Sequence, residues 1–286
     1  MPPTTIDSSW VRLGATPPDT LTDARLQVHH AAQIAVAATI SYLPARPDDS
    51  HTALTWSEPL RALVTEPIDA PRPFRIALRP ADLTLDAVRN GAESGRPFGL
   101  AGNTVASAYE WLATVAGDSG LDRTRLTARR HYEITGHPVA NGSPFALKPR
   151  AAFAELEHYW SNASRVLADL VRATEGASPV LVWPHHFDIA TLISLPPTAA
   201  RMRGTIGVGH SPGDDWYAEP YWYVGPSPYP PTANLPALDV GHWHTKGWVG
   251  GALPASEYVN ADPTEQRRLV SAFIDSAVRA CRLVMG

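Results

Sequence analysis

The sequence of 286 residues contains a single cysteine, Cys281. One cysteine cannot form an intrachain disulfide, and it excludes a zinc or iron–sulfur site built from cysteines. Cys281 lies in an apolar, helix-like pattern near the end of the chain, which predicts a small buried side chain without a chemical role.

Long apolar runs and basic runs are also missing. No stretch of about 20 apolar residues occurs, so we expect no membrane span. No basic segment followed by an apolar run opens the chain, which argues against a signal peptide and predicts a cytoplasmic protein. The formal net charge is −4, and without a basic run we expect no nucleic-acid partner.

The glycine-rich motifs of nucleotide sites are absent as well. Gly204, Gly207 and Gly209 belong to a strand-like segment and do not open a helix, so they do not form a dinucleotide fingerprint. No phosphate-binding loop occurs elsewhere. We therefore expect no nucleotide cofactor.

What the chain does contain is typical of a globular protein. Hydrophobic residues make up 44% of it and charged residues 18%. Apolar periodicity predicts long helices over residues 22–43, 103–117, 151–175 and 264–285. Short β-rich segments bounded by prolines lie between them, one of them over residues 125–134. The predicted fold class is α+β, a mostly antiparallel sheet flanked by four or five long helices.

The two halves of the chain, 1–150 and 151–286, show their predicted elements in the same order. Each has a long helix, a strand that ends in Trp56 or Trp183, two more strands and a later helix. This order indicates two duplicated α-β-β-β-α halves in one compact globule. Trp183 is followed by Pro-His-His-Phe-Asp and Trp56 is not, so we expect the site in the second half only.

Histidines and aromatic residues concentrate between residues 179 and 247, which suits a metal site. Residues two apart on a strand point to the same face, so His186 and Asp188 form one pair and His242 and His244 another. Two such strands could converge on one divalent metal, zinc by preference, with iron or manganese as alternatives. The chain would then be a soluble metal-dependent enzyme acting on a small molecule.

Asp188, His210 and Asp214 are the candidate catalytic groups of this enzyme. An open metal position would activate water, and a carboxylate would serve as general base. His210 shares its parity with Ile206 and Val208, so it points toward the apolar face of its strand. The alternative is that histidines in an aromatic-rich sheet only stack and donate hydrogen bonds.

A serine hydrolase is the minor alternative. Gly209-His-Ser-Pro-Gly213 fits the G-x-S-x-G pattern, and Asp239 and then His242 or His244 follow Ser211 in the chain. However, Pro212 has no N–H to donate to an oxyanion, and no helix pattern follows. A sharp Pro-Gly turn is the better interpretation.

A non-catalytic small-molecule-binding protein is the main alternative. Trp183, Tyr221 and Tyr223 supply flat apolar faces, and Glu219 suits a cationic or hydroxylated ligand. In the first half, two polar residues four apart share a helix face: they form a pocket wall or hydrogen-bond to each other or to backbone. These two residues are His29 and Gln33. The expected site is an aromatic-lined polar pocket, and nothing in the chain indicates its oligomeric state.

The motifs resemble a family of uncharacterised bacterial proteins that share a domain of unknown function. The resemblance runs through nearly the whole chain. It rests on His29-His-Ala-Ala-Gln-Ile34, Trp183 with Phe187-Asp-Ile-Ala190, Ser211-Pro-Gly213, Pro220-Tyr-Trp-Tyr223 and Asp262-Pro263. It implies a fold but no activity, and it marks His29, Gln33 and Asp188 as matching polar positions. Family members carry small residues where this chain has His185 and His186, so the histidine chemistry belongs to one branch or is incidental.

Overall fold

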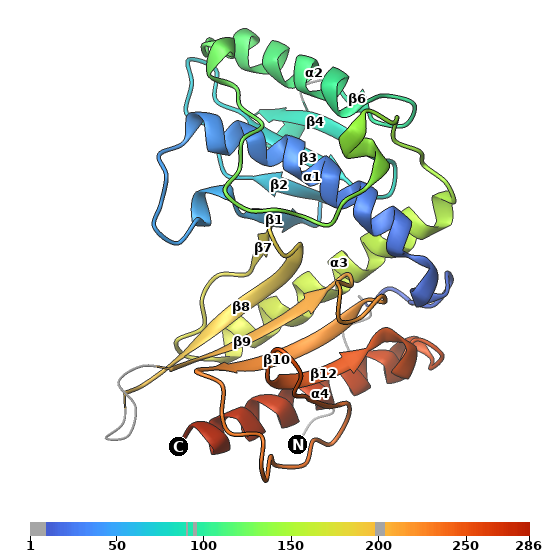
Figure 1. Ribbon diagram of the computed structural model, residues 1–286, viewed down its shortest axis with the longest axis vertical. Coiled ribbons are helices and arrows are strands. Elements are labelled where there is room, and N and C mark those ends of the chain that lie inside the picture. The colour runs from blue at the N-terminus through green and yellow to red at the C-terminus, as the bar shows by residue number, and fades with distance from the viewer. Residues whose placement is uncertain (1–9, 90, 94–95, 198–203) are drawn as a thin grey trace.

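The computed structural model describes residues 10–89, 91–93, 96–197 and 204–286. Within these ranges twelve strands form one sheet in which every pairing is antiparallel, and four α-helices accompany it (Figure 1). The predicted α+β class with a mostly antiparallel sheet is confirmed. No helix in the described ranges is long and apolar enough to cross a membrane.

The helices agree closely with the predicted ranges. Asp262 caps the last one, since its carboxylate accepts from Thr264 N at 2.9 Å and Glu265 N at 3.0 Å, and Pro263 occupies the first helical position. The bounds are α1 (Thr22–Tyr42), α2 (Val105–Asp118), α3 (Arg150–Ala173) and α4 (Pro263–Met285).

The strands form two meanders that meet in the middle of the sheet. The bounds are β1 (Leu54–Ser57), β2 (Ala62–Thr65), β3 (Arg75–Arg79), β4 (Thr84–Arg89), β5 (Ala92–Glu93), β6 (Phe98–Gly99), β7 (Leu181–Trp183), β8 (Asp188–Leu195), β9 (Gly204–Ser211), β10 (Tyr221–Ser227), β11 (His242–His244) and β12 (Gly250–Pro254). Their order is β11-β12-β10-β9-β8-β7-β1-β2-β3-β4-β5, and β6 pairs with β4. Because β1 pairs with β7, one sheet spans both halves.

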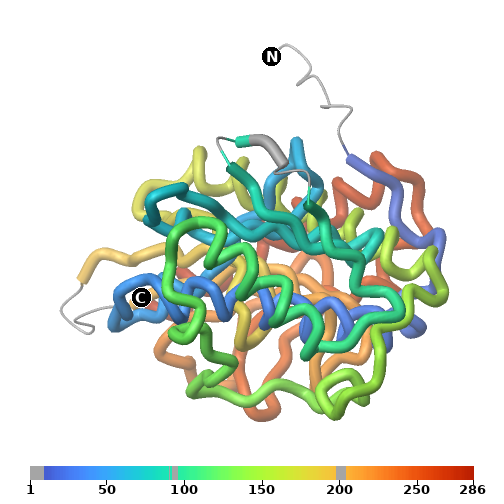
Figure 2. Tube along the Cα trace, turned by 90° about the horizontal axis from the view of Figure 1, so that it is seen from above, coloured from blue at the N-terminus to red at the C-terminus, as the bar shows by residue number. Residues whose placement is uncertain are grey.

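The helices cover one face of this sheet. Leu63 and Ile189 lie on that face, where α1 packs on β2 and β3, and α3 and α4 pack on β8, β9 and β10. In Figure 1, α1 lies in front of the sheet and α3 and α4 behind it, because adjacent strands twist by roughly 20–25°. Seen from above, α2 lies over α1 (Figure 2).

The opposite face of the second half is built from a regular row of side chains. Cross-strand partners share a face, and the register aligns Ala190 with Gly209, Tyr223, Ala252 and His242. The residues next to them along each strand, such as Ile189, His210 and Trp222, point instead toward the helices. The strand register therefore separates an open face from a core face.

One predicted strand is wrong. Residues 125–134 pair with no strand and instead run past α1, where Thr127 N donates to Ser41 Oγ at 3.0 Å and Tyr132 Oη donates to Gln33 Oε1 at 2.8 Å. Hydrogen bonds to side chains of α1 take the place of the backbone hydrogen bonds that a strand forms with its neighbour. The alternating pattern alone did not reveal this partner.

Candidate functional site

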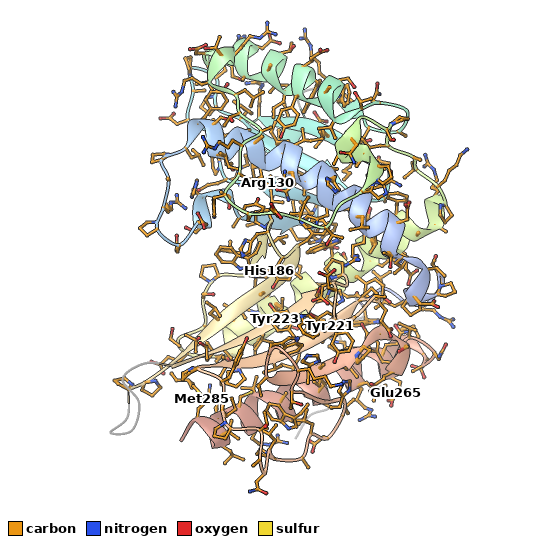
Figure 3. The ribbon with its side chains drawn as sticks, viewed as in Figure 1. Arg130, His186, Tyr221, Tyr223, Glu265 and Met285 are labelled. Carbon is orange, nitrogen blue, oxygen red and sulfur yellow. The ribbon has the colours of Figure 1, made fainter. Side chains whose placement is uncertain are left out.

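A cavity of about 590 Å³ lies on the open face of β8, β9 and β10. We call it the first cavity. Its floor includes Asp188, Ser211, Tyr221 and Tyr223, and Figure 3 shows Tyr221 and Tyr223 on the sheet with His186 toward the first half. Aromatic side chains form part of its wall, namely Trp216, Tyr229 and Trp248.

Glycines hollow out this face of the sheet. A Cβ on Gly209 would lie 2.5 Å from the hydroxyl of Tyr223 and 2.8 Å from the carbonyl oxygen of Ile189. The bare backbone of β9 therefore lets the Tyr223 ring lie across it toward β8. Gly207 and Gly225 also line the cavity. Gly207 and Gly209, which do not form a nucleotide motif, thus make room for the site.

Asp188 is the most unusual group in the first cavity. Its side chain is buried, and the Tyr223 hydroxyl donates a hydrogen bond to Oδ2. Oδ1 is closed off from solvent and accepts no hydrogen bond from any described residue. Burial raises the pKa of Asp188, while the hydrogen bond from Tyr223 opposes that rise. A residue that lines the cavity thus has one carboxylate oxygen with an unused acceptor position.

Asp214 is fully engaged by its own loop. Tyr221 Oη donates to Oδ2 at 2.6 Å, and the N–H groups of Trp216 and Tyr217 donate to Oδ1 at 2.8 and 3.0 Å. Burial and Asp214 raise the pKa of Tyr221, so Tyr221 is a neutral donor. Asp214 fixes the loop that follows β9 and has less freedom than Asp188 to serve a ligand.

The turn from β7 to β8 holds Asp188 in place. His29 Nε2 and Gln33 Nε2 both donate to the carbonyl oxygen of Pro184 at 2.8 Å. Phe187 has φ +61°, a left-handed conformation that is costly for an aromatic residue, and its ring stacks on His29 with centroids 4.6 Å apart. The prediction that His29 and Gln33 bond to backbone is therefore confirmed.

His29 also faces a second cavity of about 470 Å³. It lies between α1, residues 133–135, the turn before β8 and the loop after β9, and it shares His186, Asp214 and Trp216 with the first cavity. Burial lowers the pKa of His29 to about 3, so the ring is neutral at pH 7. α1 of the first half thus supplies one wall of this cavity, whereas we expected the site in the second half only.

The structure does not bring the four predicted metal ligands together. His186 lies in the turn before β8 and Asp188 is the first residue of β8, whereas His242 and His244 lie on β11. Three strands separate β8 from β11, roughly 19 Å at ordinary strand spacing. Tyr217 Oη lies 3.1 Å from His242 Nε2 and 3.0 Å from His244 Nδ1. Among the described residues, no group of three or more His, Cys, Asp or Glu side chains is placed to hold a metal.

Three other predicted residues lie outside both cavities. His210 is buried on the helix-facing side between Tyr159 and Trp222, with ring centroids 5.4 and 5.2 Å away. Glu219 accepts from Ser256 N at 2.6 Å and Ser256 Oγ at 2.8 Å. Trp183 pairs with Asp188 across the hairpin but lines neither cavity. This placement gives the predicted catalytic role of His210 no support, because its strand turns it away from the open face, as its parity indicated.

The serine hydrolase arrangement is not assembled. Ser211 ends β9, and its Oγ accepts from Gly213 N at 3.2 Å in a turn that leads to β10 rather than to a helix. Asp239 binds Arg279 at 3.0 Å, and His242 contacts Tyr217. The predicted partners Asp239 and His242 are thus engaged elsewhere and form no triad with Ser211.

Sequence reasoning missed Arg25, which lines the second cavity. A signal for it was present, because Arg25, His29 and Gln33 are spaced by four on a helix whose middle is otherwise Ala-, Ile- and Val-rich. A polar stripe on so buried a helix needs partners in the interior. The stripe faces the turn before β8 and the second cavity.

Comparison with known proteins identifies no family for this chain. No family model, no curated protein and no solved structure matches the chain. The resemblance to the bacterial family of unknown function stays a prediction, and the chemistry of the two cavities is what bears on function.

Proposed function

We propose that the protein binds a small molecule in the first cavity, through a hydrogen-bond donor held by Asp188 and an apolar or aromatic body held by the surrounding rings. The observation that carries this proposal is the buried Oδ1 of Asp188, which has no partner among the described residues and belongs to a residue that lines the cavity. A buried acceptor without a partner costs about 1–3 kcal/mol, and a ligand N–H or O–H removes that cost.

The exposed apolar side chains support the same site. Four large hydrophobic residues of the described chain are strongly exposed, and three of them line the first cavity: Leu192 at 46%, Trp216 at 53% and Tyr229 at 59%. Exposed apolar groups that gather around a hollow mark binding surfaces. The body of the ligand is therefore apolar or flat.

The charges of the first cavity favour a neutral or cationic donor. Asp188 and Asp214 line it, and the residues that line it include no Lys or Arg. An amine or a hydroxyl group meets the free oxygen of Asp188 without electrostatic repulsion. Two tyrosine hydroxyls already satisfy the other carboxylate oxygens, Tyr223 on Asp188 and Tyr221 on Asp214.

An enzyme acting on this ligand is the second candidate. The supporting observation is the raised pKa of Asp188, because an upward shift of a carboxyl pKa favours the transfer of its proton to a substrate. Proton transfer by Asp188 is the chemistry that we propose for this candidate.

The donor requirement is tested with three probes of similar size. Phenethylamine and benzyl alcohol carry a donor, and benzyl methyl ether does not. Binding is followed by ligand-observed NMR. We expect the two donors to bind and the ether to bind at least tenfold more weakly, a difference of about 1.4 kcal/mol.

The variant Asp188→Asn tests the residue. An asparagine oxygen still accepts from Tyr223, but the amide nitrogen replaces the free acceptor, so we expect at least a tenfold loss for both donors. Asp239→Asn is the matched control, because Asp239 is exposed and pairs with Arg279. Equal binding of all three probes, or unchanged binding in Asp188→Asn, refutes the proposal.

We also propose that the two halves of the chain arose by duplication. Each half has a helix, a meander of four strands and a later helix, and Trp56 and Trp183 are each the third residue of the first strand. This common order supports two halves of one origin, of which the second supplies the floor of the first cavity.

A further inference from the structure

The second cavity contains a cation that the first cavity does not explain. Arg25 lies near the start of α1, lines this cavity and is only 7% exposed. Its Nε is closed off from solvent without a hydrogen-bond partner. The guanidinium has no ion-pair partner within 4.0 Å in the described part of the chain. A buried, always-charged fork of donors therefore stands unused beside a hollow.

The chemistry of arginine narrows what fits there. A guanidinium presents five N–H donors in a rigid plane and keeps its charge at every ordinary pH. Buried donors of this kind are nearly always satisfied in proteins. A carboxylate accepts two parallel N–H bonds from the fork, which is the arrangement that guanidinium groups favour.

The acidic residues near Arg25 determine whether a monoanion or a dianion binds there more favourably. Glu133, Asp214 and Asp215 also line the second cavity. Asp214 already accepts three hydrogen bonds, from Tyr221 Oη and from the N–H groups of Trp216 and Tyr217, and Glu133 and Asp215 are exposed. Burial lowers the pKa of Arg25, and Asp214 and Asp215 oppose that effect. Three acids repel a dianion more than a monoanion, so a carboxylate fits better than a phosphate.

The geometry points to Arg25 as the anchor for a carboxylate group of the ligand. The two cavities adjoin, because they share His186, Asp214 and Trp216. One molecule can thus place its donor at Asp188 and its carboxylate at Arg25. The inference rests on the proposed function and names the ligand class: a small amino acid or hydroxy acid with an apolar or aromatic side chain.

The anchor is tested first with acetate as the probe. Acetate is titrated into ¹⁵N-labelled protein at constant ionic strength, and the amide signals of residues 213, 215 and 216 are followed, with chloride as the reference anion. We expect saturable shifts in the wild type, none in Arg25→Met, and about tenfold weaker binding in Arg25→Lys, which keeps the charge but loses the fork.

The matched control is Arg12→Met, because Arg12 is exposed and lines neither cavity. It should bind acetate as the wild type does. Inorganic phosphate at pH 8 is the second probe and should bind more weakly than acetate. Tighter phosphate binding overturns the assignment to a carboxylate, and the absence of a saturable acetate shift in the wild type overturns the anchor itself.

The link between the cavities is tested with L-phenylalanine, which adds a carboxylate to phenethylamine. We expect L-phenylalanine to bind the wild type at least tenfold more tightly than phenethylamine, and Arg25→Met and Arg25→Lys to reduce that preference. A preference that survives in both variants refutes the link. Failure of the donor probes with acetate still bound would refute the proposed function alone, whereas the reverse result would refute only the anchor.

Discussion

At the scale of single residues, Gly209 is the position on which the cavity floor depends. A methyl group there would collide with the Tyr223 hydroxyl at 2.5 Å and with the Ile189 carbonyl oxygen at 2.8 Å. We expect Gly209→Ala to displace Tyr223 from Asp188, to lower the free energy of unfolding by about 1–3 kcal/mol and to weaken donor probes. Urea denaturation and the NMR binding assay measure the two effects.

Gly225→Ala is the control, because it lies on the same cavity and its nearest neighbour to an added Cβ is the Val249 carbonyl oxygen at 3.8 Å. If both alanine variants are equally stable and bind equally well, the close approach of Tyr223 does not matter. The sequence indicated Asp188, Tyr221 and Tyr223 through strand alternation, yet it could not show that a glycine on a neighbouring strand makes the space.

At the scale of secondary-structure elements, the β7–β8 turn is held by two donors on one acceptor. His29 and Gln33 both donate to the carbonyl oxygen of Pro184. His29→Phe keeps the stacking on Phe187, and Gln33→Leu removes the second donor. Each single change leaves one donor, so we expect a cost of about 1 kcal/mol each, and about 1 kcal/mol more than the sum in the double variant.

Urea denaturation of the four proteins measures this coupling. Tyr132→Phe is the control for the hydrogen bond that Gln33 Oε1 also accepts from Tyr132. Strictly additive costs would show that the shared carbonyl is not what joins the two residues. Helix spacing predicted that His29 and Gln33 share a face, but their partner lies 155 and 151 residues away, and no local pattern encodes such a contact.

The order of the strands in the sheet is a second feature that the sequence could not predict. Alternation placed His242 and His244 correctly on one strand, but His186 lies in the turn before β8 and shares no strand with Asp188. Alternation could not say that β9, β10 and β12 lie between β8 and β11. Order within a sheet is set by the packing of whole hairpins, so a site that needs two distant strands is the least predictable kind from sequence.

At the scale of the whole molecule, two buried histidines make stability depend on pH. Burial lowers the pKa of His29 and of His210 from the ordinary histidine value of 6.5 to about 3. The unfolded chain takes up these protons as the pH falls below about 6.5, and the folded chain does not, so the free energy of unfolding decreases toward acid. The raised pKa of Asp188 acts in the opposite sense.

The variant His210→Phe removes the proton uptake of His210 on unfolding and leaves that of His29. His210 stacks against Tyr159 and Trp222, and neither ring nitrogen has a hydrogen-bond partner among the described residues, so a phenyl ring leaves no orphan group. We expect the slope of unfolding free energy against pH, measured by urea denaturation between pH 6 and pH 4, to fall by about 1.4 kcal/mol per pH unit. At pH 8 the variant should be at least as stable as the wild type, because both rings are then neutral. Parallel slopes in the two proteins would mean that His210 takes up its proton without unfolding.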